Sequence, residues 1–142
     1  MKGGDYVFDV AINYWAVLVA GASSMLVGSI WYARSVFGKA WMGFVGKTEE
    51  QIKEGNPARS MFFAFILSLV VAYVLAHVIG YVKVTTLVDG LLTGFWMWLG
   101  FVFATVGTNY LFEFKKFGHF AITTGYHLVQ LLVMGAILAV WQ

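Results

Sequence analysis

Four long apolar stretches constrain the fold of this chain more than any other feature. An α-helix rises about 1.5 Å per residue, so about 20 apolar residues cross the roughly 30 Å hydrocarbon core of a bilayer. Each stretch is at least this long, and none has proline, lysine, arginine or aspartate in its central part. They are residues 10–32, 60–81, 87–112 and 117–141. We therefore expect an all-α membrane protein, a bundle of four transmembrane helices.

The composition points to the same class. Hydrophobic residues make up 61% of the chain and charged residues 11%, whereas soluble domains average about 25% charged residues. The 142 residues suffice for one transmembrane domain over 1–142 with no separate soluble domain. The absence of cysteine excludes disulfides, thiolate metal ligands and cysteine nucleophiles. A net charge of +2 and the lack of any known motif argue against a nucleic-acid partner.

The basic residues predict the orientation in the cell membrane. Short cytoplasmic loops hold an excess of lysine and arginine. Seven of the nine basic residues lie in the first and third connections, and only Lys2 and Lys83 lie on the other side. The seven are Arg34, Lys39, Lys47, Lys53, Arg59, Lys115 and Lys116. We expect a multi-pass protein of the cytoplasmic membrane with both termini outside.

The first cytoplasmic loop, residues 33–59, shows a helical pattern of its own. Phe37, Trp41, Phe44 and Val45 recur at helical spacing. An amphipathic segment of this kind lies in the membrane interface with its apolar face toward the lipid. We expect a short interfacial helix here.

Two helix starts follow within the same loop. Thr48 and Gln51 have the spacing of a capping box, which opens a brief helix. Asn56 and Pro57 offer a cap and a first-turn proline for the second membrane helix.

Small residues recur at every fourth position on three of the helices. In lipid, helices associate where small side chains let their backbones approach closely. The sets are Ala16, Ala20, Ser24 and Gly28 on the first helix, Ala64, Ser68, Ala72, Ala76 and Gly80 on the second, and Gly90 and Gly94 on the third. We expect the first two sets to face each other or a neighbouring subunit, as static packing or as a sliding or gating surface.

Polar side chains at membrane depth form two stripes. Such groups are costly in lipid, so each needs a partner or a function. The stripes are Thr105, Asn109 and Glu113 on the third helix and Thr123, His127 and Gln130 on the fourth. Because a short turn joins these helices, they run antiparallel and we expect the stripes to meet. The cluster would form either a structural hydrogen-bonded network or a polar pathway that opens to the cytoplasm.

No motif in the sequence indicates catalysis. There is no serine, histidine and aspartate arrangement, no zinc-protease helix, no phosphate-binding loop and no dinucleotide-binding glycine pattern. His77 and His127 lie at different depths, too far apart to share one metal ion. We therefore expect no enzyme activity, no catalytic or metal-binding residue, and no cofactor other than a bound lipid.

Several short segments resemble one known family throughout the chain. They are Trp31-Tyr32, Phe37 to Met42, Ala72 to Ala76, Gly94-Phe95, Trp98 to Phe101, Gly125-Tyr126 and Met134 to Ala136. In this order they are similar to the small bacterial and archaeal membrane proteins of domain of unknown function 1761 (DUF1761). The resemblance implies a four-helix membrane protein and no assigned activity. The chain departs from the family pattern at Ala33-Arg34-Ser35 and at His127.

Two functions fit these observations. The first is a structural or interaction bundle that forms homo-oligomers or serves as an accessory subunit of a larger membrane complex. The second is a small oligomeric channel or transporter that uses the polar cluster of the third and fourth helices. A membrane enzyme acting on lipid or quinone would rest on aromatic abundance alone.

Overall fold

The computed structural model describes residues 9–142, which contain helices and no strand. Four helical segments are long and apolar enough to cross a membrane, which confirms the predicted all-α fold. They are α1 (Tyr14–Trp31), α4 (Pro57–Val82), a third helix over Leu87–Phe112, and α7 (Phe117–Val140). The third helix consists of α5 (Leu87–Met97), the π-helix η2 (Trp98–Phe103) and α6 (Ala104–Phe112). Lys2, one of the two basic residues expected outside, lies beyond the described residues.

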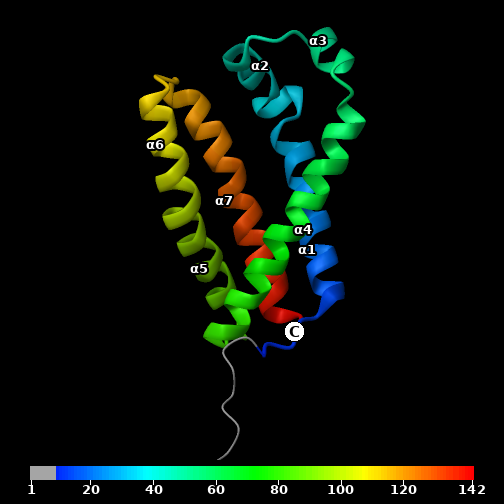
Figure 1. Cartoon of the computed structure of the whole chain (residues 1–142), viewed down its shortest axis with the longest axis vertical. Coiled ribbons are helices and arrows are strands. Elements are labelled where there is room, and N and C mark those ends of the chain that lie inside the picture. The colour runs from blue at the N-terminus through cyan, green and yellow to red at the C-terminus, as the bar shows by residue number, and fades with distance from the viewer. Residues whose placement is uncertain (1–8) are drawn as a thin grey trace, which may run out of the picture.

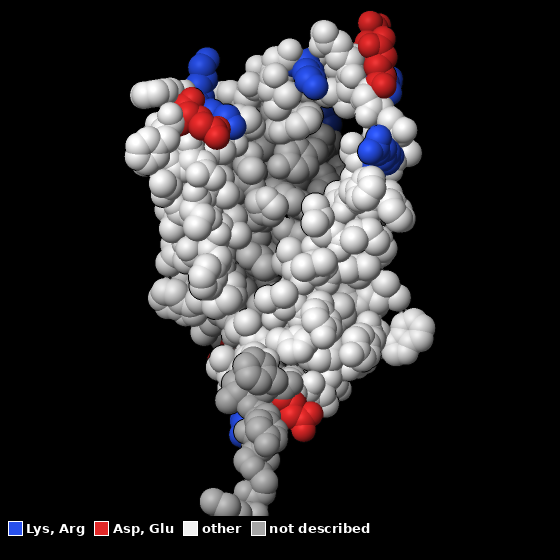
Figure 2. Space-filling model, in the orientation of Figure 1, with Lys and Arg blue, Asp and Glu red and all other residues white. Residues whose placement is uncertain are grey.

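The fourth helix, α7, is the centre of the bundle. It packs against α5, α1 and α4, while α1 and α4 also pack on each other (Figure 1). The connection from α1 to α4 and the turn from α6 to α7 lie at the same end, which we call the basic end (Figure 1). The other end, where α1 begins and α7 finishes, is the terminal end. Toward the basic end α4 and α6 separate, and Figure 2 shows that this face of the molecule is hollowed there.

Side-chain caps fix where the helices begin. The Asn13 side chain accepts hydrogen bonds from the amides of Trp15 and Ala16 at the start of α1. Asn56 does the same for Arg59 and has a φ of 56°, while Pro57 occupies the first turn of α4. This confirms the predicted cap and first-turn proline. Asparagine tolerates the left-handed conformation better than most residues, so it suits this junction.

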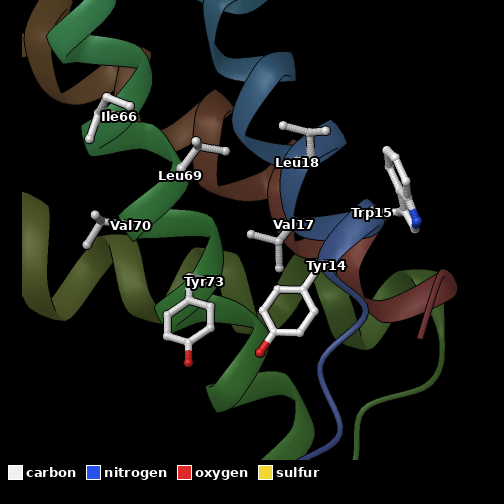
Figure 3. A pocket seen from close by; sticks show the side chains of 8 residues that line it. All are labelled: Tyr14, Trp15, Val17, Leu18, Ile66, Leu69, Val70 and Tyr73. Atoms are coloured by element: carbon white, nitrogen blue, oxygen red, sulfur yellow. The ribbon is translucent and has the colours of Figure 1, made fainter.

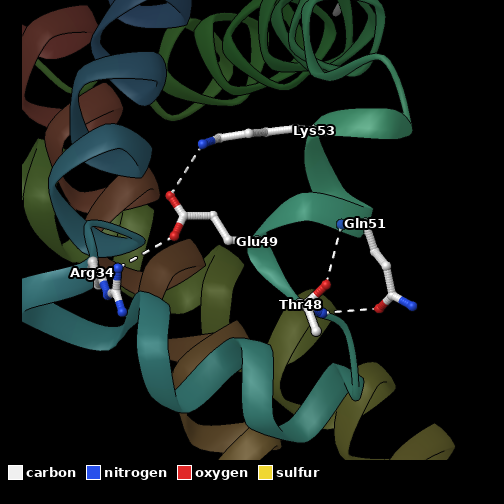
Figure 4. A network of polar contacts seen from close by, with 5 residues as sticks. All are labelled: Arg34, Thr48, Glu49, Gln51 and Lys53. Atoms are coloured by element: carbon white, nitrogen blue, oxygen red, sulfur yellow. Dashed lines mark hydrogen bonds and ion pairs between the residues drawn. The ribbon is translucent and has the colours of Figure 1, made fainter.

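The segment at the basic end is a chain of short helices. It contains a π-helix, η1 (Arg34–Gly38), followed by α2 (Lys39–Val45) and α3 (Glu49–Glu54). The capping box between Thr48 and Gln51 at the start of α3 is present as predicted (Figure 4). Glu49 bridges Arg34 at 3.3 Å and Lys53 at 3.6 Å, which ties α3 to η1 (Figure 4). Exposed pairs of this kind contribute about 0–1 kcal/mol each, so they orient the segment more than they stabilise it.

Small residues bring α1 and α4 close together. The Ser68 hydroxyl donates to the Gly21 carbonyl at 3.1 Å, and Leu69 lies directly over the missing side chain of Gly21. The predicted positions divide into buried and outer ones. Ala16, Ala20, Ser24, Ser68 and Ala72 are buried, Gly28, Ala76 and Gly80 are half-buried, and Ala64 is exposed. Ala64 lies toward the basic end of α4, where that helix has no buried residue.

The closest helix crossing joins α5 and α7. Gly90 and Gly94 are both buried, and a Cβ atom at either position would collide with the α7 backbone, at Gly135 and Leu131 respectively. Gly135 in turn has no room for a Cβ, because the Gly90 carbonyl occupies that place. The predicted glycine pair of the third helix therefore lies at this crossing.

Candidate functional site

The polar residues of the third helix do not point into the bundle. Thr105, Asn109 and Glu113 are all exposed. The Thr105 hydroxyl bonds only to carbonyls of its own helix, at Phe101 and Val102. Within residues 9–142 no hydrogen bond links these three side chains to Thr123, His127 or Gln130, so the prediction that the two stripes meet is wrong.

The π-helix η2 explains this difference. Residues of the third helix that contact α7 include Gly90, Gly94, Trp98, Phe103, Gly107 and Tyr110. The step from Trp98 to Phe103 is five residues, one more than the usual four, because η2 makes one wider turn. In an uninterrupted α-helix at about 100° per residue, Thr105 and Asn109 would lie within about 20° of Trp98. The extra residue turns them away from α7.

We call the face that Thr105 and Asn109 share with Phe101 and Phe112 the outward strip. Phe101 is 70% exposed and Phe112 is 81% exposed. In an apolar stretch of 18 residues on the third helix only 11% is buried, whereas 39% of the corresponding stretch of α7 is buried. Thr108, beside the strip, is also exposed and bonds to the Ala104 carbonyl of its own helix at 2.9 Å. The third helix therefore presents polar groups to its surroundings along its half nearest the basic end.

The polar residues of α7 find other partners. Thr123 lies 3.2 Å from the hydroxyl of Tyr110, so the expected link between the third and fourth helices is made by a tyrosine. His127 and Gln130 contact each other on α7, with 2.9 Å between Nδ1 and Oε1, and Gln130 is buried. This arrangement is a local hydrogen-bonded pair within one helix.

Two tryptophans and a tyrosine link α7 to its neighbouring helices by hydrogen bonds that the sequence did not predict. The indole of Trp31 on α1 donates to the Ile122 carbonyl at 3.0 Å, and that of Trp98 donates to the Thr124 carbonyl at 2.8 Å. The Tyr126 hydroxyl donates to the Ser24 carbonyl at 3.2 Å. These donors reach backbone carbonyls, which carry no sequence signal.

A charged pocket lies at the basic end. It encloses about 410 Å³ between α2 and the turn that joins α6 to α7. Its lining residues are Gly43, Phe44, Val45, Phe114, Lys115, Lys116 and His119. Glu113 and Lys115 form an ion pair beside it, and the hydrogen bond to Glu113 raises the pKa of Lys115 above its usual value.

Two apolar grooves open on the sides of the bundle. One, of about 550 Å³, lies between α1 and α4 near the terminal end, with Tyr14, Leu18, Ile66 and Tyr73 among its walls (Figure 3). The other, of about 650 Å³, lies between α6 and the first turns of α7. Among residues 9–142, no group of three or more histidines and carboxylates could hold a metal ion.

A protein-family model covers nearly the whole of this chain. No curated protein and no solved structure matches the chain. A family model described as "Protein of unknown function (DUF1761)" matches residues 15–139, which include all four long helices except the first residue of α1 and the last of α7. The chain therefore belongs to the DUF1761 family.

Proposed function

We propose that this chain is a structural or interaction protein of the membrane that assembles with copies of itself through the outward strip of α6. One observation carries the proposal: Thr105 and Asn109 are exposed on the least buried of the four long helices. Polar side chains inside a membrane are costly in lipid and favour contact with protein or water. A neighbouring helix would remove both residues from lipid.

Asparagine suits contact between identical copies. Its amide has a donor group and an acceptor group, and a two-fold axis that passes beside a residue brings the two copies of that residue together. Two Asn109 side chains across such an axis can therefore satisfy each other. Interhelical bonds of this kind contribute on the order of 1 kcal/mol each in membranes. The aromatic rings of Phe101 and Phe112 supply packing on either side.

Disulfide cross-linking in membranes tests the proposal directly. The chain has no cysteine, so the single variants Thr105→Cys and Asn109→Cys each introduce the only thiol that can form a disulfide. Phe63→Cys is the matched control, because Phe63 is 53% exposed on α4 at a similar distance from the basic end. We expect mild oxidation to give cross-linked dimers from the two strip variants and not from the control. Equal yields from all three variants would reject the outward strip as the interface.

An accessory subunit would use the same strip for a different helix. In that case the cross-linked product would have a mass other than twice that of the chain. Purification of the Asn109→Cys product followed by mass spectrometry separates the two forms of the proposal.

A small oligomeric channel or transporter is the second candidate. The observation that favours it is the line of Thr105, Asn109 and Glu113 on one outer face leading to the basic end. A pathway along this line would run between subunits rather than inside one bundle. Proteoliposomes loaded with a pH dye or a potassium-sensitive dye test it, with Asn109→Leu and Glu113→Gln as variants. A flux that both variants abolish supports transport, and no flux from the unmodified protein rejects it.

We further propose that the protein lies in the cytoplasmic membrane with its basic end inside. Among residues 9–142, seven basic residues lie at one end and Lys83 lies at the other. This is the pattern that retains a loop in the cytoplasm. A membrane-impermeant maleimide on intact cells should label Lys83→Cys and not Lys47→Cys. The reverse pattern would overturn the orientation.

A further inference from the structure

We propose that the charged pocket at the basic end binds the headgroup phosphate of an anionic phospholipid, one acyl chain of which lies in the groove between α6 and α7. The inference requires the helices to be in a bilayer, and it does not depend on self-association. Three observations support it: two adjacent cavities that share lining residues, the charge at their shared wall, and an exposed aromatic residue in that wall.

The two cavities are adjacent and share part of their lining. Phe114 and Lys115 line both the charged pocket and the groove. The pocket has a volume of about 410 Å³ and the groove one of about 650 Å³. The groove is walled largely by apolar and aromatic side chains, including Phe103, Leu111 and Phe120. A headgroup in the first cavity therefore leads an acyl chain directly into the second.

The charge at the junction suits a phosphate. Lys115 is paired with Glu113, and no carboxylate is among the residues that line the pocket. The structure records three ion pairs within residues 9–142, and none involves Lys116. Lys116 therefore brings an uncompensated positive charge into the pocket. It also precedes α7, whose first turn carries the positive end of the helix dipole.

The geometry of Phe114 points to the same occupant. Its φ of 53° is a conformation that bulky residues seldom adopt, and its side chain is 93% exposed. Strain of this kind is retained where the residue has a role. A lipid chain along the groove would cover the ring and remove it from water at the membrane surface.

The far wall of the pocket is built from packed aromatic rings. The ring of Phe44 on α2 stacks on His119 of α7, with 5.7 Å between centroids and an interplanar angle of 3°, and Phe44 also fills the space above Gly118. Tyr110 packs edge-on against the other side of His119 at 5.3 Å. The interfacial helix α2 is therefore held against α7 at headgroup level, where a phosphate would lie.

Native mass spectrometry of the full chain, titrated with phosphatidylglycerol or phosphatidylcholine, tests the site. Lys116→Gln removes the uncompensated charge and should weaken phosphatidylglycerol binding about fivefold, the effect of about 1 kcal/mol per basic residue near an anionic surface. Lys47→Gln is the matched control, because Lys47 is a basic residue at the same end that does not line the pocket. It should leave the affinity unchanged. Lys116→Gln should weaken phosphatidylcholine binding less than phosphatidylglycerol binding, because the choline cation offsets the charge of the phosphate.

Two further arms examine the chain and the headgroup. Ala104→Phe adds a ring inside the groove and should also weaken phosphatidylglycerol binding, while circular dichroism verifies that the helices remain. Inorganic phosphate at millimolar concentration should not displace the lipid. Equal losses from Lys116→Gln and Lys47→Gln would overturn the proposal, as would undiminished binding to Ala104→Phe. Displacement by inorganic phosphate would show a free-anion site and reject the lipid.

Discussion

Replacement of Gly94 by alanine should separate α5 from α7. The new methyl group would collide with the carbonyl oxygen of Leu131 and lie 2.8 Å from the carbonyl carbon of the same residue. Both atoms belong to the α7 backbone, so a side-chain rotation cannot relieve the contact and the helices must move apart. Overpacking of this kind costs about 1–3 kcal/mol.

Helix propensity acts in the opposite direction and must be subtracted. Alanine is favoured over glycine in a helix interior by about 0.8–1 kcal/mol. We therefore expect Gly94→Ala to lower the free energy of unfolding by about 0–2 kcal/mol in total. Gly100 provides the matched control on the same long helix, because a Cβ there would have nothing within 4 Å. Gly100→Ala should leave stability unchanged or raise it by up to about 1 kcal/mol.

The assay is reversible unfolding in mixed micelles, with SDS as the denaturant and helicity as the readout. The two alanine variants should differ by about 2 kcal/mol in the free energy of unfolding, with Gly94→Ala the less stable. If Gly94→Ala proved as stable as Gly100→Ala, the close crossing of α5 and α7 would be incorrect.

Three other perturbations have definite expected results in the same unfolding assay. Trp98→Phe removes the indole hydrogen bond to α7 and should lower the free energy of unfolding by about 1 kcal/mol, whereas Trp96→Phe should have little effect because Trp96 is 60% exposed. Asn56→Ala removes the α4 cap at a position with positive φ and should lower the free energy of unfolding by about 1–2 kcal/mol. Asn56→Gly should restore most of this loss, because glycine adopts positive φ freely although it cannot make the cap hydrogen bond. The Glu113–Lys115 pair raises the pKa of Lys115 in the folded chain, so its stabilisation is complete below the usual lysine pKa and is lost as pH rises through the raised value. Glu113→Gln should therefore flatten the dependence of stability on pH in that alkaline range, and an unchanged dependence would rule out the pair as its source.

Hydropathy predicted the four long helices because membrane spanning depends on length and on the absence of charge. Local hydrogen-bonding patterns were equally informative. The capping box of Thr48 and Gln51 and the Asn56-Pro57 junction involve neighbouring residues, so their chemistry is visible in the sequence. The start of α1 at Tyr14 rather than at residue 10 follows from the cap at Asn13, which hydropathy does not weigh.

The third helix shows where sequence reasoning failed. Predictions from periodic patterns assume a constant 3.6 residues per turn. The π-helix η2 departs from this value, and its sequence contains no proline or polar residue that would indicate the change. Its wider turn accompanies the placement of Trp98 against the Thr124 carbonyl, a contact between residues far apart in the chain. A single residue of offset then turned Thr105 and Asn109 from the expected core to the outer face.

The indole contacts to α7 were missed for a related reason. Tryptophan in a membrane protein is usually assigned to the interface or to lipid. Trp31 and Trp98 instead donate to the backbone carbonyls of Ile122 and Thr124, and carbonyls are present at every residue. Only the three-dimensional arrangement identifies which carbonyl is used.

Self-association through the outward strip is the central claim, and Förster transfer between labelled copies in liposomes tests it most directly. Donor- and acceptor-labelled chains should show energy transfer above the level of random placement, and this transfer should fall only when added lipid dilutes the protein enough to dissociate the dimer. Asn109→Leu should make the dimer dissociate at a higher protein-to-lipid ratio. A chain that shows only the transfer expected of randomly placed monomers at every protein-to-lipid ratio would contradict the account.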